Sequence, residues 1–505
     1  MQHSNNLLHL HNSQTTKFII MSKIKNLQPQ NVWGIFHELT LIPRPSKMEQ
    51  KAVEFAKNFG ESLGLKTIVD KAGNVIIRKP ATPGMENKMG IILQAHLDMV
   101  PQKNNDKKHD FEKDPIDTLI DGEWVRADGT TLGADNGIGV AAALAVLQSS
   151  EIKHGPLEVL LTIDEETGMT GAFELEKGLL NGDVMLNLDS EDEGELYIGC
   201  AGGINTSGLI KYKEIPVKPG EEGWKVSITG LKGGHSGLDI NLGRGNANKI
   251  LNRFLWHASA NLDMKISSLE GGNLRNAIPR EAFAVVTVPS AKSSEFNNAV
   301  KEYSEIFRKE FSSVEPGLAF KAELTEIPDM TMEKSSQDRL LNVVYGIPNG
   351  VMRMSNEMPG VVETSTNMAI VKAENGKAEI LCLLRSAVDS AKMSVGYMTQ
   401  SVMELGGMSV KHDGSYPGWK PNTNSPVLKT MTRIYHEKYG KTPEIKVIHA
   451  GLECGIIGDA YPDLDMVSFG PTIRNPHSPD EKVHIGSVGK FWDYLVETLE
   501  KVEEK

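Results

Sequence analysis

The sequence has few cysteines, no run of basic residues and no long uncharged apolar segment. Its 505 residues include three cysteines, Cys200, Cys382 and Cys454, which lie far apart and lack CxxC spacing. An odd number of dispersed cysteines argues against a disulfide framework and indicates reduced thiols in a reducing compartment. We therefore expect a cytoplasmic protein whose cysteines are small buried apolar residues.

An excess of positive charge is also missing. The chain has 54 Lys and Arg residues against 66 Asp and Glu residues, so its formal net charge is −12 at pH 7. No basic run is present that could neutralise phosphate groups, which argues against wide contact with nucleic acid or an anionic membrane surface. Small cationic or metal partners fit this charge better.

The first 20 residues lack the features of a targeting segment. They are rich in Asn, Gln, His, Ser and Thr, and the apolar stretch KFIIM is too short for the core of a signal peptide. We expect neither an export signal nor a transmembrane segment. Met21, followed by SKIKNL, resembles a more natural start, so residues 1–26 are predicted to be a disordered leader.

The length predicts more than one domain, and 39% apolar residues are enough to fill the cores. From about Leu27 to Ser207, amphipathic helical stretches at 47–65 and 137–150 alternate with short apolar runs at 89–95, 157–163 and 183–188. This alternation predicts an α/β domain with a mostly parallel central sheet and helices on both faces.

The pattern changes near Ile210, where KYKEIPVKPGEEG collects prolines, glycines and charges. From Trp224 to about Gly407 the predicted strands are longer and more alternating, and two segments read strand, loop, helix. These features predict an α+β domain with two similar sub-units. From about Pro417 the α/β alternation resumes. The expected organisation is a first domain in two parts, 27–207 and 408–505, interrupted by an inserted domain at 208–407.

Acids and histidines recur at the ends of the predicted strands. They are His96 and Asp98 in QAHLDMV, Asp135 in LGADNGIG, Glu165 and Glu166 in TIDEETG, Asp189 in LNLDSED and His477 in NPHSPDE. Strand ends and the loops after them are where α/β sheets place their chemistry. Mixed histidine and carboxylate groups without cysteine favour zinc, with manganese or cobalt as alternatives. The set predicts a two-metal hydrolase site.

The spacing suggests different roles within this set. Strand geometry points His96 and Asp98 to the same side, so Asp98 either orients the imidazole or lies just behind the metal. Asp135 lies in a Gly-rich loop, where a single carboxylate can bridge two cations about 3.5 to 4 Å apart. Glu165 and Glu166 diverge on any regular strand, so we expect one to bind metal and the other to act as general base.

Two neighbouring features have simpler interpretations. Gly137, Gly139 and Ala142 match the dinucleotide fingerprint GxGxxG/A, but Asp135 just before them would oppose a pyrophosphate, and no suitable strand leads into the turn. Tight helix packing explains these glycines better. Glu191, which follows Asp189, is expected to be a surface charge.

The ordered series QAHLDMVPQ, LGADNGIGVA, DEETGMTGA, GGHSGLDI, GRGNAN, RNAIPREA and NPHSPDEKV resembles the aminoacyl-histidine dipeptidases. The wider group is the co-catalytic zinc metallopeptidase family, which includes carnosinases and peptidase T. The resemblance extends from about Leu27 to the C-terminus. It implies a zinc-peptidase catalytic domain interrupted by an α+β lid domain.

The resemblance also implies a role for each residue. One zinc would be bound by His96, Asp135 and Asp189, and the other by Asp135, Glu166 and His477, while Asp98 orients His96 and Glu165 is the general base. In the lid, His235 would stabilise the developing oxyanion. Asn276 and Arg385 in the lid, and the backbone of Gly451, would bind the substrate.

The implied reaction is the hydrolysis of small dipeptides by a water activated by two divalent metal ions. The preference for Xaa-His dipeptides rests on the resemblance alone. Two alternatives remain at this stage: a deacylase of N-acyl amino acids with the same metal ligands, and a metal-binding protein without catalytic activity. The resemblance also leaves a homodimer open.

Overall fold

The computed structural model describes residues 24–505 and divides into two compact units. The first unit contains the described residues up to Ile198 together with Pro421–Val447 and Ile456–Lys505, and the second contains Gly199–Lys420 and Ile448–Gly455. The predicted leader lies outside the described residues as far as residue 23. Its last three residues form the 3-10 helix η1 (Ile24–Asn26), in which Ile24 is fully buried. The folded part of the chain therefore includes residues 24–26, which were predicted to belong to the leader.

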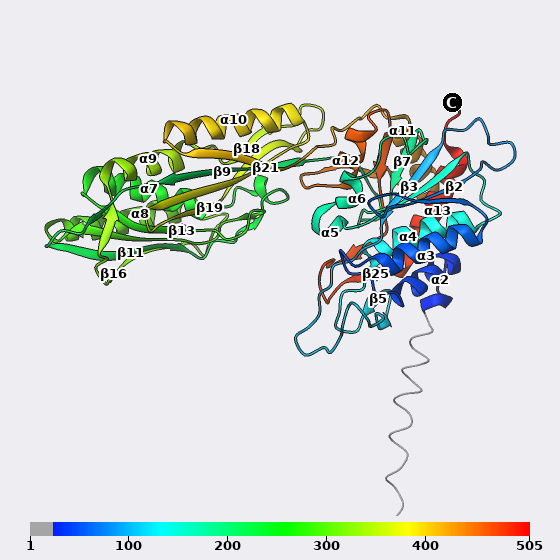
Figure 1. Ribbon diagram of the computed structural model, residues 1–505, viewed down its shortest axis with the longest axis horizontal. Coiled ribbons are helices and arrows are strands. Elements are labelled where there is room, and N and C mark those ends of the chain that lie inside the picture. The colour runs from blue at the N-terminus through cyan, green and yellow to red at the C-terminus, as the bar shows by residue number, and fades with distance from the viewer. Residues whose placement is uncertain (1–23) are drawn as a thin grey trace, which may run out of the picture. The chain divides into compact units, whose positions relative to one another are not determined.

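The first unit is built on an eight-stranded sheet (Figure 1). Its strands, in spatial order, are β1 (Lys66–Val69), β2 (Val75–Lys79), β6 (Leu157–Thr162), β3 (Ile91–His96), β7 (Val184–Asn187), β23 (Asp465–Ser468), β8 (Glu195–Cys200) and β22 (Glu444–Ile448). The four central strands, from β6 to β23, are parallel, whereas β1, β2 and β8 pair antiparallel. The predicted α/β class is confirmed, with its parallel strands at the centre of the sheet.

Helices and a small second sheet complete this unit. The main helices are α2 (Gln30–Thr40), α3 (Gln50–Ser62), α4 (Ala134–Gln148), α11 (Pro426–Tyr439) and α13 (Ile485–Lys501), and α12 (Glu453–Ala460) begins in the second unit and ends in the first. The small sheet has the order β24 (Ile473–Arg474), β25 (Lys482–His484), β5 (Trp124–Ala127) and β4 (Thr118–Asp121). The antiparallel pair β24 and β25 carries the loop that contains His477.

Helix α4 is buried from Ala134 to Leu147. A Cβ atom on Gly139 would lie 2.7 Å from the carbonyl oxygen of Leu188, and one on Gly137 would lie 2.9 Å from the Phe36 ring. Both glycines therefore allow the helix to approach its neighbours closely, as the packing interpretation of GIGVAA predicts.

The second unit contains a nine-stranded sheet. Eight strands follow the order β16 (Ala319–Thr325), β11 (Glu221–Thr229), β15 (Ala282–Pro289), β13 (Lys265–Gly271), β19 (Val362–Glu374), β20 (Lys377–Ser386), β9 (Gly202–Lys211) and β21 (Ser409–Tyr416), and β18 (Gly350–Met354) also pairs with β19. Its longest helices are α7 (Ala247–Asn261), α8 (Ser293–Glu310), α9 (Lys334–Gly346) and α10 (Asp389–Leu405) (Figure 1). Both predicted strand–loop–helix segments are present, and their strands β11 and β20 belong to this one sheet.

The observed boundaries of this unit differ from the predicted 208 and 407. Strand β9 begins at Gly202 and pairs with β20 and β21 along its length, so the unit begins before residue 208 and continues beyond 407. The segment Ile448–Gly455 also belongs to it, because Ala201 N donates to the carbonyl oxygens of Ile448 at 3.1 Å and Ala450 at 3.0 Å. Backbone pairing, which composition does not reveal, sets these limits.

The three cysteines are free and buried, as predicted. Burial raises the pKa of Cys200 to about 11 and that of Cys382 to about 12, so neither forms a reactive thiolate at neutral pH. Within residues 24–505, no helix has the length and apolar character needed to cross a membrane.

Candidate active site

Asp135 lies at the centre of the predicted ligand set. Its Oδ1 is 3.2 Å from Nε2 of His96, and its Oδ2 is 3.2 Å from Nε2 of His477. The residue is the second of helix α4 and has non-helical dihedral angles, φ −80° and ψ 110°. One carboxylate thus faces two histidines from opposite ends of the chain.

The other predicted ligands complete two groups around Asp135. Asp189 Oδ1 lies 3.2 Å from His96 Nε2, and Glu166 Oε2 lies 2.9 Å from His477 Nε2. The first group is His96, Asp135 and Asp189, and the second is Asp135, Glu166 and His477. Within each group the ligand atoms lie within 4.8 Å of one another. The structure therefore brings together all five residues predicted to bind metal.

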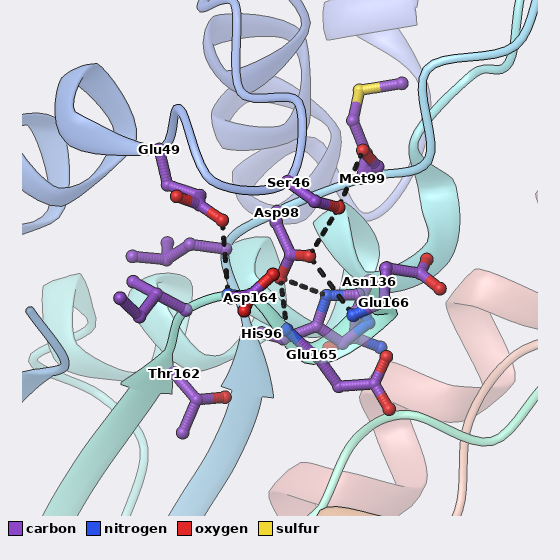
Figure 2. Close-up of polar contacts among 12 residues, drawn as sticks. Ser46, Glu49, His96, Asp98, Met99, Asn136, Thr162, Asp164, Glu165 and Glu166 are labelled. Atoms are coloured by element: carbon purple, nitrogen blue, oxygen red, sulfur yellow. Dashed lines mark hydrogen bonds and ion pairs between the residues drawn. The ribbon is translucent and has the colours of Figure 1, made fainter. Parts of the chain in front are cut away.

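Asp98 contacts His96 and the backbone of the two glutamates (Figure 2). Its Oδ1 is 3.4 Å from Nδ1 of His96 and accepts the backbone N–H of Glu165 at 3.0 Å. Its Oδ2 accepts the N–H of Glu166 at 3.2 Å and the hydroxyl of Ser46 at 2.8 Å. Burial disfavours the carboxylate, but the contacts with His96 and Ser46 outweigh burial and lower the pKa of Asp98 to about 2. Asp98 thus fixes both His96 and the Glu165–Glu166 backbone.

The sequence analysis considered Glu165 and Glu166 as residues of a strand. In the structure they lie after the strand, in a short helix. Strand β6 ends at Thr162, Asp164 adopts a left-handed conformation with φ 52°, and the two glutamates open the short helix α5 (Glu165–Gly168). Their side chains nevertheless point in different directions (Figure 2). Glu166 makes the ion pair with His477, while Glu165 also lies near His96.

The charge of the cluster fits divalent cations. Hydrogen bonds to Asp135 and Glu166 raise the pKa of His477 to about 11, and burial raises the pKa of Asp189 to about 7. Oε1 of Glu166 is buried and has no hydrogen-bond partner among residues 24–505. Buried carboxylates need compensating positive charge. Two divalent ions would supply it through ligand atoms of the types found in mixed nitrogen and oxygen sites.

Arg385, predicted to bind substrate, is buried in the second unit with only 4% of its surface exposed. Its guanidinium donates to the Tyr416 hydroxyl at 3.0 Å and lies 3.4 Å from Ser236 Oγ. Among residues 24–505, no carboxylate forms an ion pair with it. A buried guanidinium without a counter-ion favours an anionic ligand.

His235 lies beside Arg385 on strand β12 (Gly234–His235). Its Nδ1 accepts the backbone N–H groups of Gly237 at 3.2 Å and Leu238 at 3.0 Å, so the neutral ring carries its hydrogen on Nε2. Burial, followed by the charge of Arg385, lowers the pKa of His235 to about 4. At neutral pH the ring is therefore an uncharged donor.

The two remaining predicted residues also belong to the second unit. Asn276 is exposed, and its carbonyl oxygen accepts the N–H of Ser236 at 2.8 Å, which holds the segment before β14 (Ala277–Ile278) next to His235. Gly451 follows Ala450 in the Ile448–Gly455 segment and is half-buried. The substrate-binding roles of both residues stay predictions.

Comparison with known proteins identifies the family of the chain. The sequence pattern of the peptidase family M20/M25/M40 matches residues 92–501. The chain belongs to this family.

Individual relatives of this M20 peptidase cover nearly its whole length. It is 48% identical to the cytosol non-specific dipeptidase of Escherichia coli (strain K12) over 96% of this chain and 100% of the relative. The crystal structure of aminoacylhistidine dipeptidase from Vibrio alginolyticus has a TM-score of 0.92 and 50% identity, covering 96% of this chain and 99% of that one. The aminopeptidase PepT from Bacillus cereus, at 17% identity and a TM-score of 0.55, shows the same fold over 94% and 98% of the two chains. The predicted family and enzyme class are confirmed.

The sequence analysis missed His449 of this M20 peptidase. His449 is 7% exposed, and its Nε2 lies 2.7 Å from the Ser365 hydroxyl. Burial, with the charges of Arg385 and His235, lowers the pKa of His449 to about 3. Two neutral histidines thus lie near the Arg385 guanidinium, which has no ion-pair partner among the described residues. The local sequence HAGLECG does not indicate that its histidine is buried near an arginine.

The structure also corrects the prediction for Glu191. It is half-buried rather than a surface charge, and burial with the negative charges of Asp135 and Asp189 raises its pKa to about 8. Its carbonyl oxygen accepts the N–H of Ile473 at 3.0 Å. The turn after Asp189 therefore lies against the first residue of β24 instead of in solvent.

We expect His449→Gln to make the M20 peptidase less sensitive to acid. The unfolded chain protonates His449 near pH 6.5, whereas the folded chain does so only near pH 3, so the wild type loses stability as pH falls below about 6.5. One such group costs up to about 1.4 kcal/mol per pH unit in this window. The decrease in melting temperature between pH 7 and pH 5 should be smaller in His449→Gln. The exposed His436→Gln should retain the wild-type decrease, and an unchanged decrease in both variants would contradict the assignment.

Proposed function

We propose that the protein hydrolyses dipeptides at a site with two divalent metal ions. Asp135 carries this proposal, because each of its carboxylate oxygens lies 3.2 Å from a different histidine. A carboxylate in this position can bridge two ions. His96, Asp135 and Asp189 would bind one ion, and Asp135, Glu166 and His477 the other. Zinc fits these ligands, as do manganese and cobalt.

When bound, the two ions polarise the scissile carbonyl group and lower the pKa of a water molecule. Glu165 accepts the proton of that water and later donates it to the leaving amine. Asp98 keeps Glu165 in place for this task, since its Oδ1 accepts the Glu165 N–H at 3.0 Å, and it holds Nδ1 of His96 so that Nε2 faces the carboxylates.

The residues of the second unit would recognise the substrate. His235 donates its Nε2 hydrogen to the oxyanion that develops on the scissile carbonyl, which an uncharged ring can do at neutral pH. Arg385 binds the free C-terminal carboxylate of the dipeptide as the counter-ion that it lacks among residues 24–505. Asn276 and the backbone of Gly451 bind the remaining polar groups.

The breadth of side-chain specificity is the open part of the proposal. One relative is named a non-specific dipeptidase and the other an aminoacylhistidine dipeptidase. The test is hydrolysis of β-Ala-His, Gly-His, Gly-Leu and an N-acetyl amino acid by chelator-stripped protein reloaded with zinc, manganese or cobalt. Metal-restored cleavage of the dipeptides supports the proposal, and its ratio between Gly-His and Gly-Leu gives the preference. Cleavage of the acetylated compound alone would identify a deacylase instead.

We expect Arg385→Met to lower kcat/KM for Gly-Leu by about 10- to 100-fold, because a hydrogen-bonded charge is worth roughly 1.5 to 3 kcal/mol. The wild type should cleave Gly-Leu faster than Gly-Leu amide, and the variant should lose this difference. Arg385→Lys keeps the charge but not the planar guanidinium group. Its preference for Gly-Leu over Gly-Leu amide should lie between those of the wild type and Arg385→Met. Equal discrimination by all three proteins would remove Arg385 from carboxylate binding.

We also propose a cytosolic location. The Escherichia coli relative carries this compartment in its name, and the three buried, free cysteines agree with a reducing environment.

A further inference from the structure

The loop that carries Asp135 is held by a buried carboxylate that is not one of the candidate ligands. Glu481 is 2% exposed. Its Oε2 accepts the backbone N–H groups of Leu132 at 2.7 Å and Gly133 at 3.0 Å, and its Oε1 accepts those of Ala134 at 2.8 Å and Asp135 at 3.2 Å. Four consecutive N–H groups thus converge on one side chain.

A buried arginine holds the same loop through its carbonyl groups. Arg44 is 2% exposed, and its Nη1 donates to the carbonyl oxygens of Leu97 and Asp98, both at 2.9 Å. Its Nη2 donates to the carbonyl oxygen of Gly133 at 2.5 Å. Arg44 therefore ties the chain just beyond His96 to the Asp135 loop.

Gly133 receives both interactions, its N–H from Glu481 and its carbonyl from Arg44. Its φ of 69° is left-handed, and a Cβ atom there would lie 2.6 Å from Arg44 Nη2 and 2.8 Å from Met99 Sδ. The arrangement therefore requires a glycine at this position. Glu481 also lies in the same β24–β25 hairpin as His477, so one hairpin supplies both a ligand and the anchor of the loop opposite it.

We propose that Glu481 and Arg44 are positioning residues that hold residues 132–135 so that Asp135 presents one oxygen to each metal ion. The inference rests on the proposed bridging role of Asp135. Neither side chain belongs to the groups of candidate metal ligands found among the described residues. Together they hold the carboxylate of Asp135 so that one oxygen faces His96 and the other faces His477. Two ions should therefore bind more tightly than they would to a mobile loop.

Glu481→Gln tests this directly, because the side chain keeps its shape while one oxygen becomes an NH2 group that faces two N–H donors. We expect the affinity for zinc to fall by about 10- to 100-fold, the usual effect of losing an outer partner of a metal ligand. The measurement is titration of metal-free protein with zinc against a chromophoric chelator, which reports stoichiometry and affinity without any activity assay.

The chain provides a matched control. Glu158 is also buried, at 6% exposure, and accepts the N–H groups of Asn181 at 2.7 Å and Gly182 at 3.0 Å, at the opposite end of strand β6 from Glu165. Glu158→Gln should lower the melting temperature as Glu481→Gln does, yet leave zinc affinity unchanged. Equal loss of affinity in both variants would overturn the proposal, as would wild-type affinity in Glu481→Gln.

If Glu481→Gln does not fold, Arg44→Lys gives the same information. A single ammonium group cannot hold three carbonyl oxygens from two segments in the planar geometry of a guanidinium. Its control is Arg78→Lys, because Arg78 pairs with Glu158 at 2.7 Å. A lower zinc affinity in Arg44→Lys but not in Arg78→Lys supports the proposal. The same zinc affinity in Arg44→Lys and Arg78→Lys overturns it. A wild type that binds fewer than two zinc ions would instead refute the proposed two-metal function.

Discussion

Glu165→Gln is expected to lower kcat for Gly-Leu by about 10²- to 10⁴-fold while the protein still binds two metal ions. The amide cannot accept the proton of the attacking water. The backbone should not move, because the Glu165 N–H still donates to Asp98 Oδ1. The measurement is kcat under saturating substrate together with metal content by mass spectrometry of the purified protein.

Glu166→Gln separates the two adjacent glutamates. Glu166 lies 2.9 Å from His477 Nε2, so its amide should weaken metal binding as well as turnover. Excess zinc should restore part of the activity of Glu166→Gln and none of that of Glu165→Gln. If the two variants lost metal to the same extent, the assignment of Glu165 as the base would be wrong.

Asp135→Asn is expected to be the most damaging single change. A neutral amide offers one oxygen and cannot bridge two cations, so metal affinity should fall by more than the roughly 10- to 100-fold caused by loss of an outer partner. Because bound ions supply several kcal/mol of transition-state stabilisation, kcat/KM should fall by several orders of magnitude. Zinc titration and hydrolysis of Gly-Leu measure the two effects separately.

A suitable control for Asp135→Asn is Asp183→Asn. Asp183 accepts the N–H of Gly90 at 2.7 Å and pairs with Lys505 at 2.9 Å, outside both ligand groups. The control should keep its metal and its activity. If Asp135→Asn bound two zinc ions as tightly as this control, a bridging role could not be maintained.

The central strands and the ligands at their ends could be predicted from the sequence. Runs such as MGIILQA and LEVLLTI are short and mostly apolar, as buried parallel strands are, and His96 directly follows the first of them. The rule that functional groups gather beyond the carboxyl ends of such strands then brings distant motifs together. His477 could be added only through its motif, since it lies in a hairpin of the small sheet.

The supporting contacts could not be predicted. Arg44 in IPRPS and Glu481 in SPDEK look like ordinary charged residues, because nothing local shows that their partners are backbone groups 89 and 346 to 349 positions away. The limits of the second unit were misplaced for a similar reason. Strand β9 follows the first unit without a compositional break, and only its pairing with β20 and β21 assigns it to the second.

The order of the ligands along the chain has a consequence for synthesis. Four of the five candidate ligands lie before the long second unit, whereas His477 and Glu481 follow it, close to the C-terminus. Strand β23, which completes the parallel part of the first sheet, also comes from this late segment. During synthesis the whole second unit is therefore made before Asp135 can gain its second histidine. Products truncated before residue 477 would therefore carry at most four of the five candidate ligands and still lack a complete site.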